Sequence, residues 1–153
     1  MEKGLYLVCC VDGTWIGLPA AQVEAVVKVG EIIHIPHAPN AVRGLVAIRS
    51  RLLTVVDTAV VAGAAGVAAS ADAATGMAET MAVLSIEGYG YGLTLDVVDD
   101  VVEFSAFQPI LANLSTGWRR LASHMVDYRG RIILIVDPQT LVDAVLVTHT
   151  QAA

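Results

Sequence analysis

Short runs of apolar residues, each bounded by turn-forming residues, dominate the pattern along this chain. Leu5–Val11 is one such run, Asp12-Gly13 follows it, and Thr14–Leu18 is a second run. An Asp-Gly pair between two apolar runs is a strong signal for a tight hairpin turn. The pattern therefore predicts a β protein that begins with a hairpin.

The same pattern continues to the end of the chain and favours strands over helices. We expect further strands at Val42–Arg49, Arg51–Asp57, Thr80–Glu87, Tyr89–Leu95, Val97–Phe104, Arg119–Asp127 and Arg131–Val136. Asp137-Pro138 is typical of a helix start, so we expect a short closing helix at Thr140–Leu146. We interpret Phe107–Trp118 as a loop.

Two sequence motifs each occur twice along the chain, and both copies follow the same order. Arg49–Asp57 and Arg129–Asp137 both read as two arginines around one small residue, five uncharged residues and an aspartate. Gly17–Val27 matches Gly92–Val102 at a glycine, a leucine and three valines. The two matches predict a tandem duplication. Each half would contain a hairpin, a valine-rich segment, a connector and a second hairpin, enough for a small closed or nearly closed sheet.

The segment between the two halves lacks large side chains. Residues 62–80 consist mainly of Ala, Gly, Ser and Thr, without alternation of apolar and polar positions. We therefore expect subdomain 1 at residues 1–61, a flexible connector at 62–80 and subdomain 2 at 81–153. An Ala-rich helix over Ala68–Ala74 is the alternative, limited in length by the surrounding glycines.

Composition narrows the classes of function. Hydrophobic residues make up 56% of the 153 positions, which excludes a disordered adaptor. The net charge of -6 and the lack of a basic stripe argue against nucleic acid as a partner. No apolar run approaches the roughly 20 residues of a spanning helix, so we expect no membrane insertion. The adjacent Cys9 and Cys10 are interpreted as reduced core residues of a cytoplasmic protein.

Candidate catalytic and metal-binding residues do not assemble into a convincing site. Asp57 and Asp137, at the ends of apolar runs, resemble the aspartates of aspartic hydrolases, but neither is followed by the Thr-Gly that such sites use. The simpler interpretation is that each caps a turn or a helix. His34 and His37 lack a third metal ligand at suitable spacing. We expect no cofactor, and keep a small hydrolase and a small-ligand-binding regulatory domain as alternatives.

Four arginines at the two equivalent hairpin turns are the remaining candidates. Arg49, Arg51, Arg129 and Arg131 stand out in an acidic chain. They are either solvated turn residues or forks that grip carboxylates and carbonyls of a partner. The second possibility favours a binding module.

The assembled pattern resembles the CheW family of chemotaxis coupling proteins over nearly the whole chain. The resemblance is carried by "YLVCCVDGTWIGLPAAQVEAVVK", "IPHAPNAVRGLVAIRSRLLTVVDT", "VLSIEGYGYGLTLDVVDDVVEF" and "RIILIVDPQTLV". The stretch Gly44–Arg49 is similar to the most specific motif of the family, Gly-x-x-x-Leu-Arg-Gly. The resemblance implies two five-stranded SH3-like barrel subdomains that share a hydrophobic core, with a short C-terminal helix.

The resemblance also implies a noncatalytic adaptor. Such proteins connect the cytoplasmic tips of chemoreceptors to the regulatory domain of a CheA-like histidine kinase, at membrane-bound receptor arrays. Carried over to matching positions, the partner-binding residues would be Val23, Gly44, Ile48 and Arg49. The kinase contact would use an exposed apolar edge of one subdomain.

Four departures from the family pattern are visible, and one of them is Thr58, where the family has leucine after the aspartate. Ser50 replaces the glycine after the motif arginine, so a turn with positive φ there would cost about 1 kcal/mol. Thr54 stands where the family commonly has proline. Glu24 comes one position before the glutamate of the family, and Ala25 occupies that position. These departures suggest a divergent adaptor, for instance in a pathway that controls type IV pili and twitching.

Overall fold

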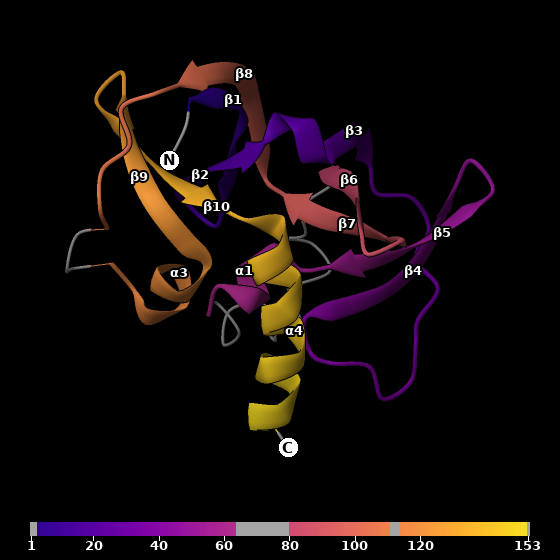
Figure 1. Ribbon diagram of the computed structural model, residues 1–153. Coiled ribbons are helices and arrows are strands. Elements are labelled where there is room, and N and C mark those ends of the chain that lie inside the picture. Colours follow the sequence, from indigo (N-terminus) through magenta and orange to yellow (C-terminus); the bar gives the residue numbers. More distant parts are fainter. Residues whose placement is uncertain (1–2, 64–79, 111–113, 153) are drawn as a thin grey trace.

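The computed structural model describes residues 3–63, 80–110 and 114–152 (Figure 1). Ten strands and four helices follow one another along these residues: β1 (Gly4–Val11), β2 (Thr14–Pro19), η1 (Ala20–Gln22), β3 (Val23–Lys28), β4 (Val42–Ile48), β5 (Arg51–Val56), α1 (Thr58–Val61), β6 (Thr80–Ile86), β7 (Tyr89–Leu95), β8 (Val97–Phe104), α3 (Thr116–Leu121), β9 (Ala122–Tyr128), β10 (Arg131–Val136) and α4 (Pro138–Ala152). No helix in the described part is long and apolar enough to cross a membrane.

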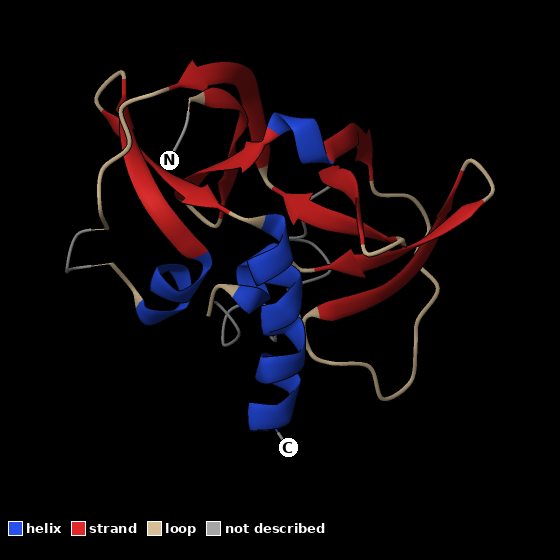
Figure 2. Ribbon diagram, viewed as in Figure 1, coloured by secondary structure: helices blue, strands red, loops and turns tan. Residues whose placement is uncertain are grey.

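The strands form two five-stranded sheets, which lie side by side in Figure 2. The first sheet has the order β8-β1-β2-β10-β9, and the second sheet has the order β3-β6-β7-β5-β4. The two orders are equivalent strand by strand, and each contains one parallel pair, β2 with β10 or β7 with β5. The expected mostly β fold with two five-stranded sheets is confirmed.

Each sheet draws its strands from both copies of the repeat. The first sheet combines β1 and β2 with β8, β9 and β10, whereas the second combines β3, β4 and β5 with β6 and β7. The expected division into 1–61 and 81–153 therefore does not hold for the sheets. The division fails because each sheet joins the first hairpin of one copy to the valine-rich strand and the second hairpin of the other. In the first sheet β8 pairs with β1 and β10 with β2, and in the second sheet β3 pairs with β6 and β5 with β7. Of the expected connector, residues 64–79 lie outside the described residues.

Four two-residue turns close the hairpins, and every turn residue has positive φ. The turns are Asp12-Gly13, Arg49-Ser50, Glu87-Gly88 and Arg129-Gly130. Two consecutive positive φ angles are the signature of the type I′ turn, whose twist matches that of the flanking strands. Ser50 has φ 65°, so the strained turn that its replacement of glycine implied is present.

The hydrophobic core lies mainly between the two sheets and uses side chains from both. Its largest cluster joins Leu7, Ile16 and Leu134 of the first sheet to Leu84 and Leu93 of the second. Two smaller clusters, one in each sheet, are formed by side chains that alternate with those of the shared core. Burying a large aliphatic side chain contributes about 1.5–3 kcal/mol, so this shared cluster holds the sheets together.

The helices differ from expectation more than the strands do. α3 (Thr116–Leu121) occupies part of the stretch expected as loop, and strand β9 consequently begins at Ala122 instead of Arg119. α4 begins at Pro138, as the Asp-Pro signal indicated, but extends to Ala152, well beyond the expected Thr140–Leu146. In Figure 1 it runs down from the junction of the two sheets.

Candidate partner-binding site

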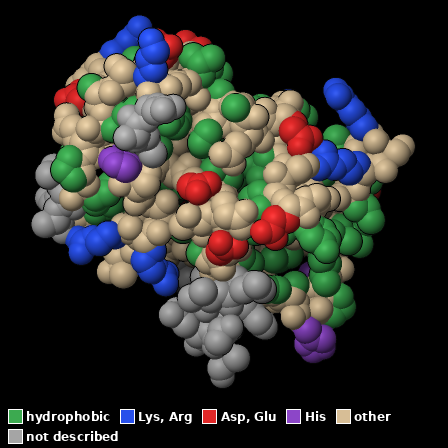
Figure 3. Space-filling model, viewed as in Figure 1, with side chains coloured by type: hydrophobic (Ala, Val, Ile, Leu, Met, Phe, Trp, Pro, Cys, Tyr) green, Lys and Arg blue, Asp and Glu red, His purple; other side chains and the backbone are tan. Residues whose placement is uncertain are grey.

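Two of the four expected partner-binding residues lie together at the tip of the β4–β5 hairpin. Ile48 ends β4, and Arg49 is the first residue of the turn, exposed to solvent. Both line a small hollow of about 250 Å³, which we call the Arg49 hollow. Its other lining residues are Glu24, Ala25, Val27, Arg51, Leu53 and Val83. Basic side chains stand out at this hairpin tip in Figure 3.

The Arg49 hollow has an apolar floor and a charged rim. Ile48, Ala25 and Val27 pack against the inner cluster of the second sheet. Arg49 forms no ion pair with any described residue, whereas Arg51 on the same rim is engaged. An uncompensated guanidinium beside apolar surface can form charge-assisted hydrogen bonds to a carboxylate or carbonyl of another molecule.

Val23 and Gly44 are not part of this hollow. Val23 packs against the central core between the sheets. Gly44 is buried with φ 145°, and a Cβ atom there would lie 2.3 Å from the carbonyl oxygen of Ile33. The glycine is therefore required by close backbone packing. In the structure both residues support the sheet that carries Ile48 and Arg49.

A polar network beside the hollow joins three strands of the second sheet. Arg51 donates to Glu24 at 2.7 Å and to the hydroxyl of Ser85, which in turn donates to Glu24 at 2.6 Å. Hydrogen bonds from Ser85 and Arg51 hold the pKa of Glu24 below its usual value. The register of β3 against β6 shifts at Glu24, and this β-bulge turns the carboxylate toward Arg51.

The first sheet contains the equivalent arrangement. The register of β8 against β1 shifts at Asp99, which corresponds to Glu24 at the repeat offset of 75 residues (Glu24 against Asp99). The carboxylate of Asp99 lies 3.7 Å from Arg131, the counterpart of Arg51. From the sequence alone, both arginines are interpreted as solvated turn residues or as forks for a partner, and neither of them is paired with Glu24 or Asp99. The acidic residue that follows the first matched valine, Val23 or Val98, in each aligned segment was the available signal.

Asp57 and Asp137 have separate, local partners. Asp57 is buried, pairs with Arg43 at 2.6 Å and accepts a hydrogen bond from the Val60 amide at the start of α1. Asp137 accepts from the Gln139 amide at the start of α4. The cap interpretation is confirmed for both, and the contacts account for each carboxylate without a shared catalytic proton.

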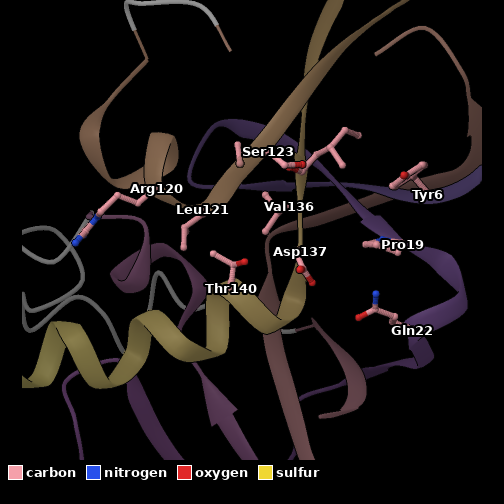
Figure 4. Close-up of a pocket in the computed structure, with 11 residues that line it drawn as sticks. Tyr6, Pro19, Gln22, Arg120, Leu121, Ser123, Val136, Asp137 and Thr140 are labelled. Atoms are coloured by element: carbon pink, nitrogen blue, oxygen red, sulfur yellow. The ribbon is translucent and has the colours of Figure 1, made fainter. Parts of the chain in front are cut away.

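A second hollow, of about 410 Å³, surrounds Asp137 (Figure 4). Asp137 and Thr140 come from the start of α4, Arg120 and Leu121 from the end of α3, and Gln22 from η1. The lining therefore includes one negative side chain, Asp137, and one positive side chain, Arg120. This hollow contains none of the four expected partner-binding residues.

The described residues form neither a metal-binding cluster nor a reactive thiol site. No group of three or more His, Cys, Asp and Glu residues within the described ranges is placed to hold a metal ion. Cys9 and Cys10 are free and buried. Burial raises the pKa of the Cys9 thiol to about 12, so the nucleophilic thiolate is scarce at neutral pH.

Comparisons with known proteins agree with this architecture. The scaffolding protein TtCheW from Thermoanaerobacter tengcongensis has a similar fold, with a TM-score of 0.72 and 21% sequence identity over 92% of this chain and 88% of that chain. A search of curated proteins returns no match. The family model described as CheW-like domain matches residues 5–146. Because that match spans almost the whole chain, the protein belongs to the CheW-like domain family, whose members are noncatalytic scaffolds of chemotaxis.

Proposed function

We propose that this chain is the adaptor that couples chemoreceptors to a CheA-type histidine kinase. The observation that carries the proposal is the family match across residues 5–146. In this role the chain sits in the cytoplasm, bound to membrane-embedded receptor arrays, and transmits a signal by the placement of its partners. It serves either a swimming or a type IV pilus pathway.

The Arg49 hollow is the receptor contact in this proposal. The receptor tip is helical, and helix-in-groove binding needs apolar anchors with a few polar locks. Ile48 supplies an anchor at the hairpin tip, and Arg49 supplies the lock. Val23 and Gly44 act indirectly, since one packs in the core and the other allows Ile33 to approach β4.

Co-purification with a receptor tip fragment and a CheA regulatory domain tests this proposal. We expect Arg49→Glu to weaken receptor capture while leaving the melting temperature unchanged, because Arg49 has no ion pair with the described residues. Arg129→Glu is the matched control. It makes the same charge change at the equivalent turn of the first sheet, where Arg129 lies 5.1 Å from the centre of the Tyr128 ring.

Equal receptor capture by wild type and Arg49→Glu would remove the hollow from the receptor interface. Failure of the wild-type chain to capture either partner would contradict the coupling function itself. A deletion strain then identifies the pathway, because it loses either swimming chemotaxis or twitching, and complementation with wild type restores it.

A further inference from the structure

An apolar cavity lies between α4 and the second sheet, away from the Arg49 hollow. Its volume is about 530 Å³, within the range of small-molecule sites. Three parts of the chain line it: strand β5 with the β6–β7 hairpin, the loop 35–39, and one face of α4. We call it the tyrosine cavity, because Tyr89 and Tyr91 both border it.

The charge in the lining of the tyrosine cavity is negative. Glu87 stands at the β6–β7 turn and Asp143 on α4, and neither forms an ion pair with a described residue. Among the described lining residues, only His37 can carry positive charge. Burial raises the pKa of Tyr91, with smaller contributions in the same direction from Glu87, Tyr89 and Asp143. Figure 3 shows acidic beside apolar side chains where α4 meets the second sheet.

The two tyrosines add aromatic surface to this negative environment. Tyr89 and Tyr91 are two positions apart on β7, so their side chains point to the same face of the strand. Tyr89 is 69% exposed, although large aromatic side chains are usually covered. Aromatic faces attract organic cations, and the attraction is stronger beside carboxylates and out of water.

The repeated sheet fold does not require tyrosines at positions 89 and 91. At the repeat offset of 75 residues, the first sheet has Thr14 and Ile16 where the second sheet has Tyr89 and Tyr91. Ile16 is fully buried in the core, and its strand pairs with β10 as β7 pairs with β5. The same backbone is therefore built without the tyrosines in the first sheet, and although Tyr91 packs partly against the core, Tyr89 is left largely exposed.

We propose that the tyrosine cavity binds a small organic cation with an apolar body, such as an aryl or alkyl ammonium compound. The ammonium group lies between the tyrosine rings and the carboxylates of Glu87 and Asp143. The apolar body contacts Val56, Ile86 and Val142. This binding site is independent of the coupling function, and either can be wrong without the other.

The test is an NMR titration of the purified full-length chain with benzyltrimethylammonium, up to about 10 mM, a range that reveals millimolar binding. We expect saturable shifts of the amide signals of Tyr89, Tyr91 and Asp143. Phenylacetate, of similar size and opposite charge, should leave them unchanged. Titration with sodium chloride at equal ionic strength corrects for salt effects.

Two variants locate the bound cation. The double variant Glu87→Gln with Asp143→Asn should bind at least about fivefold more weakly, the effect of one charge contact near the surface. Tyr89→Leu should bind about threefold more weakly. Asp12→Asn, the turn equivalent of Glu87 in the first sheet, should bind like wild type. All these positions are exposed, so we expect the variants to fold.

Three results would overturn the proposal. The first is the absence of saturable shifts at the cavity residues, and the second is equal binding of phenylacetate. The third is an unchanged affinity in the double variant. If the cavity signals respond to an arginine-rich helical peptide but not to the small cation, the occupant is a protein segment and the proposal is wrong.

Discussion

The guanidinium of Arg131 lies over the indole ring of Trp15, 3.7 Å from the ring centre. Arg51, its counterpart in the second sheet, has Gly90 at the position equivalent to Trp15. A Cβ atom on Gly90 would lie 3.1 Å from the guanidinium of Arg51. The duplicated arginine therefore covers an aromatic ring in the first sheet, whereas in the second sheet it lies beside a glycine and bonds to Glu24 and Ser85.

Replacing Arg131 should cost more stability than replacing Arg51. The two side chains are similarly exposed, at 41% and 40%, so exposure does not distinguish them. We expect Arg131→Ala to lower the free energy of unfolding by about 1–2 kcal/mol through the lost ring contact. Arg51→Ala should lower it by less than about 1 kcal/mol. Urea unfolding measures both, and an equal loss in the two variants would contradict the role of Trp15.

The turn at Ser50 should be improved by glycine. Ser50 has φ 65°, and the equivalent Gly130 has φ 79° with no atom within 4 Å of an added Cβ. We expect Ser50→Gly to raise the free energy of unfolding by about 1 kcal/mol and Gly130→Ser to lower it by a similar amount. Opposite shifts of the two urea midpoints would confirm that backbone strain is the cause. Shifts in the same direction would refute it.

Gly44 should tolerate no side chain. A Cβ atom would overlap the Ile33 carbonyl and lie 2.7 Å from the Ile32 side chain. We expect Gly44→Ala to lower the free energy of unfolding by about 2–3 kcal/mol. Gly13→Ala is the control, because it also has positive φ but open space around it, and should cost about 1 kcal/mol. Comparable losses would show that the contact with Ile33 is easily relieved.

The two aspartates that end the repeated phrase should differ in importance. Asp57 is buried and paired with Arg43, whereas Asp137 is exposed and caps α4. Asp57→Ala removes the ion pair with Arg43 together with the hydrogen bond that caps α1, which should cost about 2–4 kcal/mol. Asp137→Ala should cost about 1 kcal/mol, as for other helix caps. Thermal unfolding of the two variants checks this order, and a larger loss at Asp137 would reverse it.

Glu24 should make stability depend on pH in the acidic range. Its pKa is lowered from the usual 4.5 by hydrogen bonds from Ser85 and Arg51. The ionised carboxylate therefore stabilises the fold above that usual pKa, and the contribution is lost as pH falls through the lowered value. Glu24→Gln should unfold at lower urea than wild type at neutral pH, and the difference should disappear as the pH falls below the lowered pKa of Glu24. A difference that persists in acid would assign the effect to packing instead of charge.

Local patterns in the sequence were enough to place most elements. Asp12-Gly13 marks the first hairpin, and Asp137-Pro138 marks the start of α4, because both depend on backbone preferences of adjacent residues. The duplication was visible because equivalent strands carry the same order of valines and arginines. α3 was missed because its six residues (Thr116–Leu121) include Gly117, which has poor helix propensity but is needed for close contact with Ala62.

The candidate site was only partly predictable. Ile48 and Arg49 are neighbours in the sequence, so their joint position at the hairpin tip follows from the turn itself. Val23 and Gly44 are distant in the sequence, and β-bulges at Glu24 and Arg43 shift the register of the strands that carry them. A bulge moves all following side chains to the other face, and alternation alone does not locate it.

The order of residues is enough to define two equivalent sets of short strands closed by tight turns in an acidic, largely apolar chain. It does not say that the first hairpin of each copy pairs with the valine-rich strand and second hairpin of the other, which is seen only in the folded protein. Strand propensity and turn chemistry act between residues that are close along the chain. The choice between two similar hairpins as pairing partners depends instead on how the shared core between the sheets is buried.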